Sequence, residues 1–224
     1  MYKTIATALL LTVAGLKATE GVQHDGAKLG EWTMDYSAAL KLAKSAQKPL
    51  LLNFTGSDWC GWCKIMDKNV FAKADWKNFA ADNVVLVTLD FPRDKSIVPG
   101  RYVEWNKKLK DQFAVRGYPT YVIIDSDGKT TLGKLGAGRS KTPKSFITEF
   151  QNTVKLSANA IAAYVKAHPE KGDAYKAAIK EFSDSKKSLA DWIATRPKRN
   201  PENNKKYEAF KDRISKAQAA LGKF

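Results

Sequence analysis

Two cysteines three residues apart are the side chains in this sequence best suited to chemistry. Cys60 and Cys63 are the only cysteines among 224 residues, and they lie within Trp-Cys-Gly-Trp-Cys-Lys. An apolar run at residues 49–54 precedes them and predicts a buried strand, and residues 55–58 are typical of a turn. Apolar residues at helical spacing follow. We therefore expect the pair at a strand-to-helix junction, with Cys60 at the N-terminus of the helix.

This placement predicts redox chemistry. The free N–H groups and partial positive charge of a helix N-terminus stabilise a thiolate, so we expect Cys60 to be the nucleophile. Cys63 lies one turn later on the same side, and we expect it to be the more buried of the two. Residues i and i+3 of a helix have Cα atoms about 5–6 Å apart, which a disulfide tolerates. The pair could therefore close and open without movement of the backbone.

Four alternatives for the pair stay open. A zinc site needs four ligands, and the only histidines, His24 and His168, are distant in sequence. Haem attachment needs His after the second Cys, where this chain has Lys64. An inert disulfide would close too short a loop to stabilise the fold much, and two buried thiols fit poorly with the polar turn. We favour a redox pair that needs no metal or other cofactor.

The surrounding chain alternates between strand and helix patterns. The predicted elements are a helix at 36–47, a strand at 49–54, helices at 60–71 and 74–82, a strand at 84–89, a helix at 101–115, strands at 119–124 and 130–135, and a helix at 142–156. Strands joined through helices, followed by a hairpin and a closing helix, predict an α/β fold: a three-layer α/β/α sandwich with a mixed central sheet.

The last third of the chain predicts an all-helical, basic extension. Residues 157–224 contain 15 Lys and Arg against 8 Asp and Glu, and the whole chain has a net charge of +15. Apolar stripes predict helices at 158–167, 172–182, 185–195 and 201–221. The charge favours weak attraction to anionic surfaces or acidic partners, or simply a solvated face. Export of the protein would speak against a nucleic-acid partner.

The N-terminus is typical of an exported protein. Lys3 precedes apolar residues 5–16 and the small residue Ala18, which predicts a signal peptide over residues 1–18, with an uncleaved anchor as the alternative. Residues 19–30, which include His24, predict a flexible leader. We therefore expect a periplasmic or secreted protein, where disulfides persist.

With these motifs in place, residues 31–156 resemble the thioredoxin family. The resemblance depends on the Cys60–Cys63 motif after a buried strand, on Gly-Tyr-Pro-Thr at 117–120, and on the glycine-bearing turn at 136–138. It implies a thioredoxin-like domain in which Cys60 attacks and Cys63 resolves. It also implies that Pro119 follows a cis peptide bond and faces the cysteines. The resemblance further implies a substrate-binding surface formed by Trp59, Gly61, Trp62, Tyr118 and Pro119, although packing alone could explain the two tryptophans.

Two positions depart from the family pattern. Asn53 stands where reducing members carry a buried carboxylate that takes the proton of the resolving thiol, and Asp58 is the acid nearest in sequence. Trp62 stands where small thioredoxins have Pro, and this residue tunes the redox potential.

The function we expect is that of an exported thiol–disulfide oxidoreductase that acts on protein substrates. A redox partner protein, in the membrane or free, would supply or accept the electrons. The alternative is a thioredoxin-fold binding or chaperone module whose helical tail recognises a partner.

Overall fold

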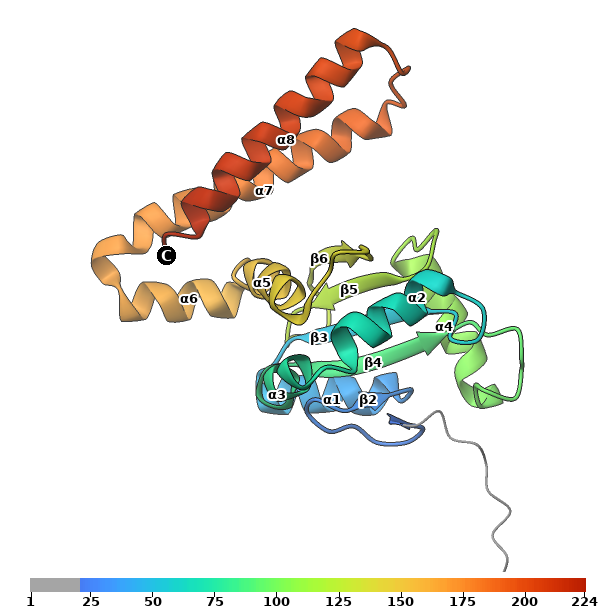
Figure 1. Cartoon of the computed structure of the whole chain (residues 1–224). Helices are drawn as coiled ribbons and strands as arrows, with labels where there is room; N and C mark the ends of the chain where they lie inside the picture. Colours follow the sequence, from blue (N-terminus) through green and yellow to red (C-terminus); the bar gives the residue numbers. More distant parts are fainter. Residues whose placement is uncertain (1–20) are drawn as a thin grey trace, which may run out of the picture.

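The computed structural model describes residues 21–224, and its core is a six-stranded mixed sheet (Figure 1). The strands are β1 (Val22–Gln23), β2 (Trp32–Thr33), β3 (Leu50–Thr55), β4 (Val85–Asp90), β5 (Thr120–Ile124) and β6 (Thr131–Gly136). Their order in the sheet is β1-β2-β4-β3-β5-β6. Strand β3 runs parallel to β4 and antiparallel to β5, and β5 and β6 form a hairpin.

The helices cover both faces of this sheet, which confirms the predicted three-layer α/β/α sandwich. They are α1 (Tyr36–Ala46), α2 (Gly61–Met66), the π-helical turn η1 (Asp67–Phe71), α3 (Ala74–Asn83), α4 (Gly100–Gln112) and α5 (Pro143–Val154). Helices α1 and α4 supply side chains to the core on one face. Helices α2, α3 and α5, with η1, supply the core on the other.

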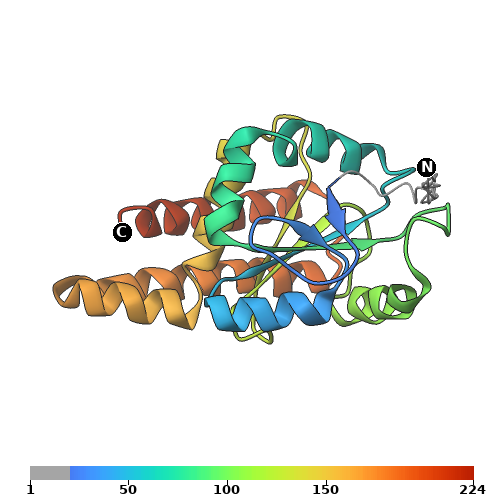
Figure 2. The same cartoon turned by 90° about the horizontal axis from the view of Figure 1, so that it is seen from below.

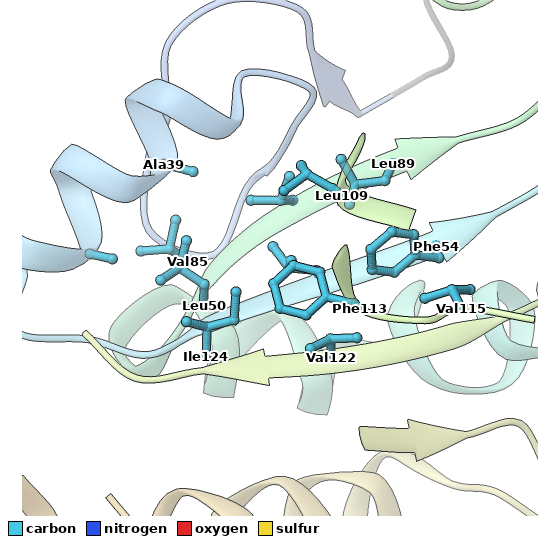
Figure 3. Close-up of a cluster of buried hydrophobic side chains, with 13 residues drawn as sticks. Ala39, Leu50, Phe54, Val85, Leu89, Leu109, Phe113, Val115, Val122 and Ile124 are labelled. Carbon is cyan, nitrogen blue, oxygen red and sulfur yellow. The ribbon is translucent and has the colours of Figure 1, made fainter. Parts of the chain in front are cut away.

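The central strands are apolar because both of their faces are covered. All six residues of β3 and all six of β4 are buried. Leu50, Leu52 and Phe54 join the core beneath α1 and α4, which Figure 3 shows in close-up. Since successive strand residues point to opposite faces, Leu51 and Asn53 face α2. Leu51 lies in the second core, among the aromatic rings of η1, α3 and α5.

Helix starts are set by local hydrogen bonds that the sequence encodes. The Asp35 carboxylate accepts the N–H of Ala38 at the start of α1. Thr142 and Ser145 form a reciprocal capping box at the start of α5, whose first residue is Pro143. Both arrangements satisfy N–H groups that have no partner within the helix.

The C-terminal extension is a helical arm with a core of its own. It comprises α6 (Ala158–Ala167), the 3₁₀ turn η2 (Pro169–Lys171), α7 (Gly172–Ala194) and α8 (Pro201–Leu221). Helices α7 and α8 pack along each other on the side of α5 and β6, and they slant away from the sandwich toward the loop that joins them (Figure 1). Seen from below, they lie behind the sandwich (Figure 2). Their buried side chains are Tyr175, Ile179, Phe182, Ala217 and Leu221.

One expectation for the arm is wrong: residues 172–194 form a single helix rather than two. The break expected between residues 182 and 185 contains no Gly or Pro. Instead, Lys180 forms an i,i+4 salt bridge with Asp184 across the expected break. Ser185 lies buried and donates its hydroxyl to Glu181, so it stays within the helix.

Residues 21–30 also differ from the predicted flexible leader, because they add to the sheet. Strand β1 pairs in parallel with β2, and Leu29 forms a bridge with Val85. The Tyr102 hydroxyl donates to the carbonyl oxygen of His24, and Arg101 forms a salt bridge with Asp25. The predicted signal peptide, residues 1–18, lies outside the described residues.

Within residues 21–224, the structure contains no helix with the length and apolar character that a membrane span needs.

Candidate functional site

The cysteine pair lies at the junction of β3 and α2, as the sequence predicts. Strand β3 ends at Thr55, and the next residues turn sharply so that the N–H groups of Trp59 and Cys60 both donate to the carbonyl of Gly56, at 3.2 and 2.8 Å. Helix α2 then begins at Gly61. Because β3 is buried on both faces, this junction is held at the carboxyl end of the central strands.

Cys60 and Cys63 form a disulfide, with their Cα atoms 5.3 Å apart. Cys60 is the N-cap residue of α2, and its Sγ accepts the backbone N–H of Cys63 at 3.1 Å. When the disulfide is reduced, this N–H and the helix N-terminus favour a thiolate at Cys60. Cys63 is more buried than Cys60, as expected, but the difference is small: Cys60 is 5% exposed and Cys63 is 3% exposed.

Two tryptophans flank the pair at the surface. Trp59 is 39% exposed and Trp62 is 43% exposed. The Trp59 indole N–H donates to the carbonyl oxygen of Phe91 at 2.9 Å, which fixes the orientation of its ring. The guanidinium of Arg139 lies 5.6 Å from the Trp62 ring centroid. Apolar side chains exposed beside a buried disulfide can contact a protein substrate.

The segment before β5 completes the surface around Trp59. The Tyr118–Pro119 peptide bond is cis, as the family resemblance implies. The Tyr118 ring meets the Trp59 ring edge-on, with centroids 5.6 Å apart. Gly61 is exposed, and Pro119 is buried directly before β5. The structure therefore places Trp59 and Tyr118 in contact, although 58 residues separate them in sequence.

Beneath η1 lies a cavity that the sequence does not predict, with several polar side chains in its lining. Its volume is about 570 Å³. The polar residues that line it include Asn53 and Thr55 from β3, Thr88 and Asp90 from β4, and Asp67 from η1. Asn53 is paired with Thr88 in the sheet. Alternation along the strands points the β3 and β4 residues toward α2, where a sandwich core is normally apolar.

The carboxylates of this cavity differ in their bonding. Asp90 is 4% exposed and accepts the backbone N–H and hydroxyl of Ser57, at 2.9 and 2.5 Å. Burial raises the pKa of Asp90, and the bonds from Ser57 oppose that rise. Desolvation, with a smaller contribution from the charge of Asp90, raises the pKa of Asp67 to about 6. Both acids are therefore easier to protonate than a free aspartate side chain in water.

Asp58, the acid nearest to the pair in sequence, has a structural role instead. Its carboxylate accepts the backbone N–H groups of Arg93 and Asp94. These bonds lower the pKa of Asp58, so it holds a proton poorly. Asp58 ties the turn before the cysteines to the loop after β4.

The two histidines lie apart from the cysteines. His24 belongs to the segment that joins the sheet edge, and His168 ends α6 in the arm. Within the described part of the chain, no group of three or more His, Cys, Asp and Glu side chains could hold a metal ion.

Comparison with known proteins gives relatives for the sandwich. A family model described as a thioredoxin-like domain matches residues 36–151. Over 101 residues the chain is 40% identical to "Disulfide bond reductase DsbH" of Chlamydia pneumoniae, which covers 45% of this chain and 60% of that protein. Over 126 residues it is 29% identical to "Thioredoxin-related protein DsbJ" of Chlamydia pneumoniae, which covers 56% of this chain and 35% of that protein.

The chain thus spans less than two thirds of the length of these curated relatives. A solved structure titled "DsbH Oxidoreductase" is similar with a TM-score of 0.52 and 27% identity. The similarity covers 69% of this chain and 96% of that one.

Proposed function

Because this chain belongs to the thioredoxin-like family, we propose that it is a thiol–disulfide oxidoreductase acting on protein substrates. The observation that carries the proposal is the Cys60–Cys63 disulfide at the N-terminus of α2, beside exposed Trp59. A disulfide that merely braced the fold would gain little from so short a loop.

The reaction is a pair of thiol–disulfide exchanges. In the reduced protein, the Cys60 thiolate attacks a substrate disulfide and forms a mixed disulfide, while one substrate thiolate leaves. Cys63 then attacks the Sγ of Cys60, and the second substrate thiolate leaves. Two electrons pass from the protein to the substrate. We propose this reducing direction because a relative 40% identical over 101 residues is named a disulfide bond reductase.

Substrate binding would use the surface around the disulfide. Trp59, Trp62 and Gly61 are exposed there, and the Tyr118–Pro119 segment lies beside Trp59. An extended substrate segment would pack on the tryptophans and form strand-like hydrogen bonds with the backbone of Tyr118.

The setting we propose is the periplasm or the exterior of the cell. The support is the signal-peptide pattern of residues 1–18 and the persistence of disulfides in such compartments. There the sandwich, residues 31–156, would carry the chemistry. A second redox protein, soluble or in the membrane, would reduce the Cys60–Cys63 disulfide after each turnover.

A second function is supported by the arm. Its core is separate from both cores of the sandwich, and it exposes large apolar side chains near its far end, Ile193 and Tyr207. Residues 157–224 would recognise a client protein or an anionic surface. As a binding module, the protein would hold its partner whether or not the cysteines react.

Insulin reduction tests the enzymatic proposal. Cys60→Ser should abolish the reduction of insulin, because the attacking sulfur is lost. Cys63→Ser should retain the first exchange and accumulate a mixed disulfide with the substrate. Full activity of Cys60→Ser would contradict the mechanism and favour the binding module. Client capture by the unreacted Cys60→Ser protein would show that recognition by the arm is independent of the chemistry.

A further inference from the structure

The reaction proposed above creates a need for a proton acceptor near Cys63. Only the thiolate form of Cys63 can attack the mixed disulfide. Cys63 is 3% exposed and belongs to the inward-facing stripe of α2 and η1, with Met66 and Val70. Since its thiol has almost no contact with bulk water, the proton needs a path through the protein.

Asp67 follows Cys63 by one helical turn. The backbone N–H of Asp67 donates to the carbonyl of Cys63, so the turn between them is α-helical. Side chains at i and i+4 lie on the same face of a helix, with Cβ atoms about 5–6 Å apart. Asp67 also lines the cavity beneath η1. The side chain is therefore close to Cys63 and in contact with a space that can hold water.

The cavity contains polar groups that lack a protein partner. The side-chain oxygen of Asn53 and the indole N–H of Trp76 are buried without a hydrogen bond in the described structure. Both residues line the cavity, and they are 7% and 1% exposed. Buried polar atoms are nearly always bonded to protein or ordered water. An acceptor and a donor that face one cavity of about 570 Å³ indicate that water occupies the part of the cavity beside them.

Asp67 fits the role of acceptor better than the other two acids nearby. Asp90 already accepts two bonds from Ser57 and is 4% exposed, so its carboxylate is less available to accept a further proton. Asp58 is held by the loop after β4. Among residues 21–224, no hydrogen bond or salt bridge engages the Asp67 carboxylate, and Asp67 is exposed at the cavity.

We propose that Asp67 accepts the proton of the Cys63 thiol, directly or through cavity water, as Cys63 resolves the mixed disulfide. The proton passes from Cys63 Sγ to the Asp67 carboxylate, and the Cys63 thiolate attacks Cys60 Sγ. The Cys60–Cys63 bond forms as the bond between Cys60 and the substrate sulfur breaks. The substrate sulfur leaves with the electron pair, and Asp67 returns its proton to solvent or to the leaving thiolate.

The charges around Asp67 suit this task. Asp90 on β4 opposes a second negative charge, and the pKa of Asp67 is raised to about 6 mainly by desolvation. Tyr121 on β5 stays neutral, because burial and the charge of Asp67 both raise its pKa. Lys77 on α3 and Glu31 beside β2 also line the cavity. An acid that titrates near neutrality is well placed to accept a proton and release it again.

The reaction of the full-length reduced protein with Ellman's reagent has two steps, so the rates of the two exchanges can be measured separately. Attack by Cys60 releases one thionitrobenzoate, and resolution by Cys63 releases a second. We expect the second release in Asp67→Asn to slow about 100-fold at pH 7, the lower end of what general base catalysis contributes. The first release should be unchanged. In the wild type, the rate of the second release should rise through about pH 6, and this rise should be absent in the variant.

Three further variants distinguish Asp67 from the other acids nearby. Asp67→Glu should restore most of the rate and a similar pH profile, whereas Asp75→Asn, which changes an exposed acid on α3, should behave as wild type. A second release from Asp67→Asn with the wild-type rate and pH profile would overturn the proposal. A loss that appears only in Asp90→Asn would assign the role to Asp90 instead. Failure of the first release in the wild type would contradict the proposed function rather than Asp67.

Discussion

At the scale of single residues, Gly56 sets the position of Trp59. A Cβ added at Gly56 would lie 2.4–2.6 Å from three atoms of the Trp59 ring. The ring is held by its bond to Phe91 and by Tyr118, so it cannot move freely. We expect Gly56→Ala to displace the ring, to lower the free energy of unfolding by about 1–3 kcal/mol, and to reduce insulin turnover. Urea unfolding and the insulin assay measure the two effects.

Gly100→Ala is the matched control for this change. A Cβ at Gly100 meets nothing within 4 Å, and the residue begins α4. Since Ala favours a helix over Gly, stability should stay the same or rise by up to about 1 kcal/mol, with activity unchanged. Equal behaviour of the two variants would show that the ring has no fixed position.

The raised pKa of Asp67 predicts a pH dependence of stability. The folded protein binds this proton at a pKa of about 6, above the value of 3.8 for a free side chain. The stability that the proton provides is fully present below about pH 4 and is lost as the pH rises through about 6. Asn at position 67 does not titrate. As the pH rises from about 4 through about 6, Asp67→Asn should therefore become more stable relative to the wild type. Urea unfolding from pH 4 to pH 7 measures the free energy of unfolding of both proteins. A difference between them that stays constant over this range would contradict the raised pKa of Asp67.

At this scale, sequence predicted the covalent pair and missed the cavity. The sequence displays the Cys60–Cys63 spacing directly, whereas the cis bond before Pro119 is implied only by the resemblance to the thioredoxin family. Whether Asp67 is near Asp90 depends on the pairing of β3 with β4 and on how α2 crosses them. The sequence shows Asn53 in place of a carboxylate, but it indicates only the acid nearest along the chain, Asp58, and not the acid that lines the cavity, Asp67.

At the scale of elements, apolar side chains packed between α7 and α8 stabilise the arm. Leu221 is 1% exposed and lies in the arm core with Tyr175 and Phe182. We expect Leu221→Ala to cost about 2–5 kcal/mol of arm stability, because the cavity it leaves removes packing as well as transfer free energy. Amide hydrogen exchange should accelerate in α7 and α8 and remain slow in β3.

Ile193→Ala is the control within the same arm. Ile193 is 50% exposed, so truncating it should change exchange little. Acceleration in β3 equal to that in α8 after Leu221→Ala would mean that the arm and the sandwich unfold as one unit.

Sequence predicted most elements, and its errors have physical causes. The buried strands β3 and β4 and the helices of the sandwich were predicted within a few residues, because their apolar patterns are strong. The short strands β1 and β2 have two residues each, and only pairing with β4 in three dimensions defines them. The continuity of α7 was missed because Ser183 and Ser185 are typical of helix ends, while pairs such as Lys180–Asp184 support the helix across them.

At the scale of the whole molecule, the sandwich and the arm have separate cores. The two sandwich cores contain no buried residue after Phe150, and the arm core contains none before Tyr175. The two units still touch: Leu135 of the sandwich lines one groove with Phe182 and Ile193 of the arm. Asn159 of the arm donates a hydrogen bond to Ser126 at 3.0 Å. Since each unit buries its own apolar side chains, the sandwich should fold without the arm.

Deletion of residues 157–224 therefore separates chemistry from recognition. We expect the shortened protein to release both thionitrobenzoates at wild-type rates, because every residue assigned to the exchange lies before the arm. The arm carries 15 basic and 8 acidic residues. The full chain should therefore bind anionic lipid vesicles more tightly than the shortened one at low salt. This difference should vanish at about 1 M salt, where the Debye length is about 3 Å. Vesicle sedimentation measures binding, and a shortened protein that binds as well as the full chain would place the attraction in the sandwich.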